Sequence, residues 1–259
     1  MQRLFLAVFL AGLGCAAAPA SESSTAAFEL YRSGKYEAAI MAGETAGDGE
    51  SLAVAARAAF AEANLSETPC LSCLQRVERL ARRSVMLDAA HPEAWVYLAA
   101  ALGYQARIVG NVRAQFAHYP EQAKAAIDQA LSVAPGDGWS LAAAGAWHIE
   151  VVRNAGSVLA RALYGARAEL GKEYFHRAFA ADPENLVIRF QYALTLSGYD
   201  LPANRDEVMM ALDAAVNMEP RTVYERAIQQ RASRLLELLK ANRRADYLAM
   251  VGRYQGYPG

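Results

Sequence analysis

Two cysteines three positions apart, Cys70 and Cys73, are the residues best suited to chemistry in this sequence. Thr68 and Pro69 precede them and are typical of the start of a helix, where a thiolate is stabilised. Thiol–disulfide exchange enzymes, however, carry this motif in a strand-helix-strand unit, and nothing in this sequence indicates a strand. Two cysteines also supply only half of a structural zinc site. We therefore expect a local structural disulfide in an oxidising compartment, with redox catalysis and metal binding as the alternatives.

The other side chains suited to catalysis or metal binding are dispersed along the chain. The four histidines are far apart, and His148 lies two residues from Glu150, a spacing that points the two side chains to different sides of a helix. Neither a glycine-rich phosphate loop nor a recognisable nucleophile motif is present in the sequence. We expect no enzyme activity, no metal site and no cofactor. The histidines are His91, His118, His148 and His176.

The composition indicates which kind of fold must position any functional residues. Alanine is abundant, while sustained alternation of polar and apolar residues is missing, which favours helices over strands. The 259 residues carry 26 basic and 27 acidic side chains, so no overall basic excess is available to hold nucleic acid or an anionic membrane. We expect an all-α protein that does not bind nucleic acid.

The chain repeats a helix-turn-helix pattern. LYRSGKYEAAI, residues 30–40, has the Gly and Tyr of a tight turn between two helices. Four later segments end a helix with a small residue, an apolar residue and then an acidic residue or Pro; their prolines are Pro92, Pro135, Pro183 and Pro220. The helices that follow these stops show apolar and small residues at steps of three and four, and we expect the small residues Ala99, Gly145 and Ala193 to let adjacent helices approach closely.

These segments resemble the tetratricopeptide-repeat (TPR) family over most of residues 26–220. The resemblance implies an α-solenoid with a right-handed superhelix, here made of about five degenerate, lengthened helix pairs. Leu235–Leu239 and Tyr247–Val251 predict C-terminal capping helices. We expect residues 21–259 to form one such TPR-like domain.

Residues Gly145–Ala166 are similar to a stretch of the regulator of microtubule dynamics family, in which a Trp-containing helix leads into an apolar insertion. That family is also built on TPR-like helices, and the resemblance implies an association with lipid. In this sequence the insertion spans 154–168, and its apolar part is Val158–Tyr164. The sequence leaves open whether the insertion fills the groove of the solenoid.

The TPR resemblance implies that the first helix of each pair lines a concave groove. This predicts an apolar and aromatic groove, without the cluster of Lys, Arg and Asn that some family members use to hold a terminal carboxylate. The alternative is that several of these residues are core residues between helices. The predicted lining is Phe28, Tyr31, Arg32, Val96, Tyr104, Trp139, Ile149, Glu150, Phe190 and Leu194.

Three functions are compatible with this pattern. The first is a binding or scaffold module that accepts a protein or peptide partner in its groove. The second is a carrier of a lipid-like apolar ligand, and the third is a thiol–disulfide redox protein acting through Cys70 and Cys73.

The first twenty residues have the features of a signal peptide. Arg3 precedes the apolar run Leu4–Leu13, and Ala18-Pro19-Ala20 forms a small-x-small cleavage pattern. The run is about ten residues, against roughly 20 for a spanning helix, and no later segment is long and apolar enough to span. We expect cleavage after Ala20 and a periplasmic or secreted protein. The alternative is a lipoprotein anchored through Cys15.

Overall fold

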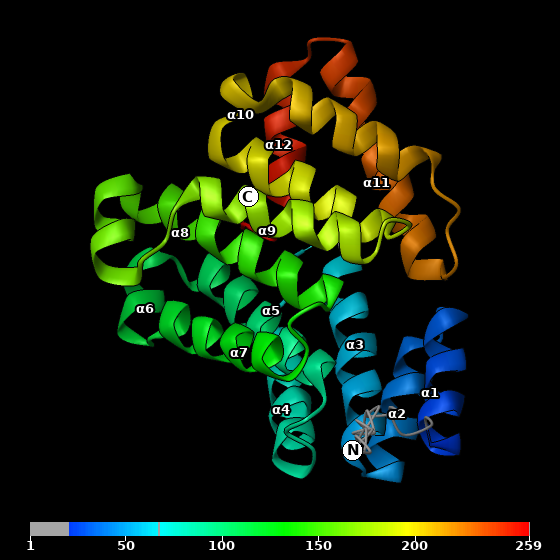
Figure 1. Ribbon diagram of the computed structural model, residues 1–259. Helices are drawn as coiled ribbons and strands as arrows, with labels where there is room; N and C mark the ends of the chain where they lie inside the picture. The colour runs from blue at the N-terminus through cyan, green and yellow to red at the C-terminus, as the bar shows by residue number, and fades with distance from the viewer. Residues whose placement is uncertain (1–20, 67, 259) are drawn as a thin grey trace, which may run out of the picture.

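The computed structural model describes residues 21–66 and 68–258, and over these residues the fold is all-α, as predicted (Figure 1). The predicted signal peptide and Cys15 lie outside the described residues. Twelve helices and no strand are found in the described part of the chain. They are α1 (Glu22–Arg32), α2 (Tyr36–Ala46), α3 (Gly49–Leu65), α4 (Leu71–Leu87), α5 (Pro92–Val109), α6 (Asn111–Phe116), α7 (Tyr119–Val133), α8 (Gly138–Tyr164), α9 (Ala168–Ala181), α10 (Leu186–Asn217), α11 (Val223–Lys240) and α12 (Arg244–Tyr254).

Turn residues and helix caps fix the helix boundaries. Gly34 has a φ of +79° in the turn between α1 and α2, a conformation that residues with a side chain rarely adopt. Pro92 occupies the first turn of α5, and Pro135, Pro183 and Pro220 lie in the connections before α8, α10 and α11. The residues that then cap these three helices with side-chain hydrogen bonds are Asp137, Asn185 and Thr222.

The helices pack mainly against their neighbours along the chain. The antiparallel pairs are α1 with α2, α3 with α4, α5 with α7, and α8 with α9. The short α6 lies between α5 and α7 in the chain. The two halves of α10 form a fifth pair, because non-helical backbone at Asp200 and Asn204, around Pro202, bends the chain back. Tyr192 in the first half donates a hydrogen bond to Glu207 in the second.

Glycines allow α8 and α9 to cross closely. A Cβ atom added to Gly145 would lie 2.6 Å from the ring of Phe175 and 2.8 Å from the carbonyl oxygen of Gly171. One added to Gly171 would lie 2.6 Å from Ile149 and 2.8 Å from the carbonyl oxygen of Gly145. The two backbones are therefore in direct contact, as the small residue at Gly145 predicted.

The two C-terminal helices fold back over the first half of the protein. They pack on α10 and on each other, but they also reach α3, since Arg231 of α11 donates to the backbone oxygen of Asn64 over 2.9 Å. Figure 1 shows the lower end of α11 close to the upper end of α3, and Arg107 of α5 donates to the backbone oxygen of Gln255 at the end of α12. Helices were predicted at Leu235–Leu239 and Tyr247–Val251, and α11 and α12 contain these segments; α11 also contacts α3. None of the described helices combines the length and apolar character needed to cross a bilayer.

Candidate ligand-binding cavity

A cavity of about 310 Å³ lies inside the curve of the helices. Its walls come from α5 and α8, with further residues from α3, α6, α7, α10, α11, α12 and the C-terminal tail. The volume falls at the lower end of the range of small-molecule sites in proteins.

Small residues on α5 and α8 create this space. Ala99, Ala100 and Gly103 face the cavity from α5, and Ala142, Ala143 and Ala146 face it from α8. A Cβ atom added to Gly103 would meet no other atom within 4 Å, so the free volume extends to the backbone of α5. The larger lining residues are mainly aromatic: Phe60, Tyr97, Tyr104, Tyr119, Trp139, Trp147, Tyr164, Phe190, Tyr224, Tyr254 and Tyr257.

An ion-pair network forms one polar end of the cavity. Glu150 lies 3.3 Å from Arg107 and 3.7 Å from Arg153, and the side chains of Glu150 and Arg107 are only 13 % and 11 % exposed. Burial works to lower the pKa of Arg107, but Glu150 together with Tyr104 and Tyr257 outweighs burial, and the pKa lies above its ordinary value. Arg107 also donates to the backbone oxygen of Gln255, and Arg153 donates to its side-chain oxygen over 2.9 Å. The network thus fastens the C-terminal tail over the cavity.

Asn64 of α3 holds a second set of polar groups at the cavity wall. Its side-chain nitrogen donates to the Tyr104 hydroxyl over 3.1 Å, and its side-chain oxygen accepts from the Tyr224 hydroxyl over 3.2 Å. Arg231 donates to the same oxygen over 3.1 Å. Burial raises the pKa of Tyr224 well above its ordinary value, so its hydroxyl stays protonated. These groups can orient a polar part of a ligand while the rest of the wall stays apolar.

The ten predicted groove residues divide equally between two places. Val96, Tyr104, Trp139, Glu150 and Phe190 line the cavity.

The other five do not line it. Tyr31, Ile149 and Leu194 are buried core residues between helices. Phe28 packs against that core under Arg57, whose guanidinium lies 4.9 Å from the Phe28 ring. Arg32 is an exposed residue that pairs with Glu29 on the same helix.

The lining residues that come from other helices were not predicted from the sequence. Asn64, Tyr224, Tyr254 and Tyr257 lie on α3, α11, α12 and the tail, which no groove was predicted to include. Arg107 could have been found, because it follows Tyr104 by three residues on the same face of α5.

The insertion at 154–168 does not fill the cavity. Gly156 interrupts α8 with a φ of +76°, and the helical segment 157–164 turns its apolar side chains outward. Val158, Leu159 and Leu163 are 78 %, 55 % and 69 % exposed. Only Asn154, Ala155 and Tyr164 of this segment reach the cavity wall.

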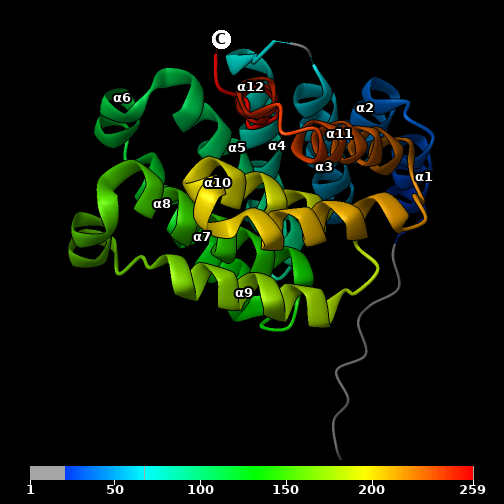
Figure 2. The same cartoon turned by 90° about the horizontal axis from the view of Figure 1, so that it is seen from above.

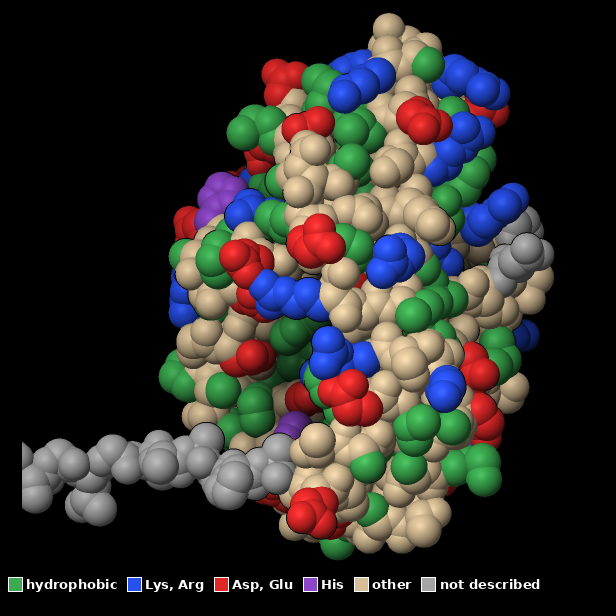
Figure 3. All heavy atoms as spheres, turned by 90° about the vertical axis from the view of Figure 1, so that its right-hand side faces the viewer, with side chains coloured by type: hydrophobic (Ala, Val, Ile, Leu, Met, Phe, Trp, Pro, Cys, Tyr) green, Lys and Arg blue, Asp and Glu red, His purple; other side chains and the backbone are tan. Residues whose placement is uncertain are grey.

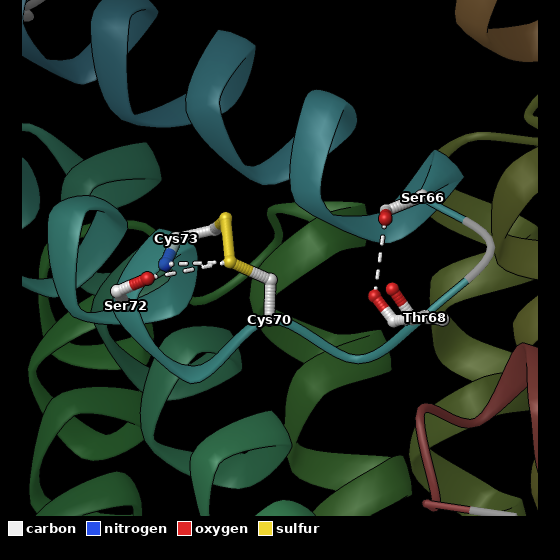
Figure 4. The surroundings of a disulfide bond; sticks show 5 residues. All are labelled: Ser66, Thr68, Cys70, Ser72 and Cys73. Atoms are coloured by element: carbon white, nitrogen blue, oxygen red, sulfur yellow. Dashed lines mark hydrogen bonds between the residues drawn. A yellow bond between two sulfur atoms is a disulfide. The ribbon is translucent and has the colours of Figure 1, made fainter.

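The structure joins Cys70 and Cys73 by a disulfide at the start of α4 (Figure 4). The Sγ atom of Cys70 accepts a hydrogen bond from the backbone nitrogen of Cys73 over 3.2 Å and thereby caps the helix. Both residues are half-buried, and neither lines the cavity.

Replacing both cysteines with serine is expected to lower the free energy of unfolding by no more than about 2 kcal/mol, because so short a loop removes little entropy from the unfolded chain. A serine at position 70 also replaces the sulfur as a helix cap. Urea unfolding followed by circular dichroism measures the change. A double variant without helical signal would contradict this prediction.

No group of three or more His, Cys, Asp and Glu side chains is arranged to hold a metal ion within 21–66 and 68–258. His148 is buried behind the cavity wall, stacked on Tyr174 and edge-on to Trp147. Burial lowers its pKa to about 4, helped by the positive charges of Lys124 and Arg167 and opposed by Asp128. The imidazole is therefore neutral in the folded protein at neutral pH.

We expect the protein to lose stability between pH 6.5 and 4 through His148. In this range the unfolded chain binds a proton at His148 that the folded chain does not, so unfolding becomes easier as the pH falls. The loss should reach about 1 to 3 kcal/mol. Urea unfolding at pH 7 and pH 4.5 measures it, and His148→Leu should lose less over the same range. Equal losses in the two proteins would show that His148 is not responsible.

No known protein family model matches this chain, and a search of curated proteins found no similar sequence.

Proposed function

We propose that this protein binds a small apolar molecule, or the apolar tail of a lipid-like ligand, and carries it without chemical change. The observation that supports this proposal is the 310 Å³ cavity with apolar, aromatic walls and two neighbouring sets of polar groups, around Asn64 and around the Arg107–Glu150 pair. Sites of this kind, in which a few polar groups orient an otherwise apolar ligand, are typical of small-molecule binding.

The ligand would lie between α5 and α8. Its apolar part would contact Ala100, Ala143 and Trp139, and its polar part would point to Asn64 or to the Arg107–Glu150 pair. Because the Arg107–Glu150 pair carries one charge of each sign, a neutral polar group fits this end better than a free charge.

Native mass spectrometry of the gently purified protein tests the proposal. A bound apolar molecule should appear as a discrete added mass that is lost in organic solvent. Protein that is empty after purification, and that takes up no fatty acid or phospholipid added afterwards, would contradict it.

A second proposal is that the chain is a TPR-type scaffold for a protein or peptide partner. The arrangement in successive helix pairs supports it, together with the turn at Gly34 and the close crossing at Gly145. The C-terminal tail lies over the groove, which disfavours a long extended peptide there. A pull-down from a periplasmic extract that recovers a partner, and loses it when Trp139 is replaced by alanine, would favour the scaffold. Recovery of no partner would count against it.

Thiol–disulfide exchange is the third hypothesis. The observation in its favour is that Cys70 and Cys73 lie close enough to form a disulfide with each other. An insulin-reduction assay decides the matter, since a redox protein would accelerate the reduction and a structural disulfide would not.

We also propose export, with cleavage after Ala20. In the structure Ser21 caps α1, and its backbone nitrogen donates to Glu50 over 3.0 Å. Cleavage would turn this nitrogen into a charged amino group facing a carboxylate, a stabilising exchange. Mass spectrometry of the cellular protein should find Ser21 at its start, whereas an acylated Cys15 would identify a lipoprotein.

A further inference from the structure

Two short segments at one side of the molecule expose large apolar side chains to water. Val112 and Phe116 of α6 are 71 % and 83 % exposed, and Val158, Leu159 and Leu163 protrude from the end of α8. These five residues, here called the apolar tip, are among twelve exposed large apolar residues in the described part of the chain. Such a concentration in two short segments marks an interaction surface.

The two segments lie on the same side of the protein. Figures 1 and 2 both place α6 beside the end of α8, and the Tyr164 hydroxyl donates to the side-chain oxygen of Gln115 over 2.7 Å. Neither segment uses these apolar side chains to fill the core. They are therefore available to a partner outside the chain.

Three arginines lie in or next to the two segments that carry the apolar tip. Arg113, Arg161 and Arg167 are exposed, and within the described residues no carboxylate lies within 4.0 Å of any of them. Segments 111–118 and 153–168 contain no Asp or Glu; the nearest acidic residues along the chain are Glu121 and Glu169. The balanced composition of the whole chain thus conceals a local excess of positive charge.

The opposite side of the molecule differs. Figure 3 shows that face, with acidic and basic side chains interspersed over it. A mixed surface of this kind favours solubility rather than attachment.

We propose that the apolar tip docks on an anionic lipid bilayer. Apolar side chains that enter the boundary between headgroups and acyl chains, beside arginines that contact anionic headgroups, are the features of an interfacial membrane contact. A second copy of the chain fits less well, because a two-fold contact through the tip would bring its arginines together.

Docking would place one end of the cavity at the bilayer. Asn111, Gln115 and Tyr164 line the cavity. In the sequence each of them is next to a residue of the apolar tip, namely Val112, Phe116 and Leu163. Membrane docking nevertheless does not depend on the proposed ligand, because the apolar tip lies on the outer surface. Failure of ligand binding would therefore leave vesicle binding unchanged, and the two proposals can fail separately.

Vesicle sedimentation tests the docking with protein purified as the cell processes it. The protein should sediment with vesicles of phosphatidylcholine and phosphatidylglycerol, less with phosphatidylcholine alone, and less as salt is added. The triple variant Val112→Ser, Phe116→Ser, Leu163→Ser should lose affinity by about tenfold or more, and Arg113→Gln with Arg161→Gln should remove the preference for anionic vesicles. The matched control is Met86→Ser with Met210→Ser, which changes residues 76 % and 72 % exposed elsewhere and should bind like the wild type.

Amide hydrogen exchange locates the contact. Anionic vesicles should slow exchange in 111–118 and 157–164 and leave α1 and α2 unaffected. Wild-type binding by the triple variant, protection elsewhere than in the two segments, or a dimer in solution that the triple variant abolishes would overturn the proposal.

Discussion

Gly145→Leu is expected to destabilise the protein by about 3 kcal/mol or more, because overpacking at a closed contact forces helices apart. Even the first atom of the new side chain would lie 2.6 Å from the Phe175 ring and 2.8 Å from the backbone oxygen of Gly171. Phe175 is fully buried and its ring packs against Phe179 and Tyr192, so any movement of the ring disturbs these contacts. In a repeat fold, moving α9 away from α8 also weakens the contacts of both with their neighbours.

Urea unfolding of Gly145→Ala, Gly145→Leu and Gly252→Leu measures the effect. Gly145→Ala should also be destabilised, by less than the leucine variant. Gly252 lies within α12 with open space around it, so Gly252→Leu should be neutral or slightly stabilising, by up to about 1 kcal/mol. Wild-type stability in Gly145→Leu would show that the α8–α9 crossing is wrong.

Glu150→Leu is expected to cost about 3 to 5 kcal/mol, the usual loss when one partner of a buried ion pair is removed. In the wild-type protein Arg107 and Arg153 both pair with Glu150. The substitution removes this carboxylate and leaves the two arginines without it. It also weakens the attachment of the tail, because Gln255 binds the same two arginines. Unfolding should therefore become easier, and the tail should exchange its amide hydrogens faster.

The matched control for Glu150→Leu is Glu237→Leu. Glu237 pairs with Arg234 on the surface of α11, where both side chains are at least half exposed, and such pairs contribute less than about 1 kcal/mol. Combining Glu150→Leu with Arg107→Leu should recover part of the lost stability, since it replaces the buried pair with an apolar one. Equal stability of the Glu150→Leu and Glu237→Leu variants would contradict the buried network.

The helices and their ends could be predicted from the sequence because their signals are local. Pro92 begins α5, and Gly34 permits the turn after α1, each through its own backbone chemistry. Gly145 is a comparable case. A glycine is unfavourable within a helix, so its presence in α8 predicted a close contact, which the structure places against Gly171.

The cavity lining was harder to predict because it depends on the rotation of each helix and on distant segments. Ile149 and Glu150 were both assigned to the groove, yet adjacent helical residues point about 100° apart. Glu150 faces the cavity, and Ile149 is buried against α9. The contact of Tyr224 with Asn64 joins residues 160 positions apart, and no local pattern encodes such a pairing.

A ligand titration of cavity-filling variants tests whether the space between α5 and α8 binds an apolar ligand. Gly103→Leu projects a side chain into open cavity space, so the fold should keep its stability or gain up to about 1 kcal/mol. Gly103→Ala adds little volume, and Gly252→Leu adds the same side chain outside the cavity. Titration with a fluorescent fatty acid should show binding by the wild type and by both controls. Gly103→Leu should bind at least about tenfold more weakly, a loss of 1.4 kcal/mol or more. Wild-type affinity in a folded Gly103→Leu protein would show that the ligand does not bind between α5 and α8.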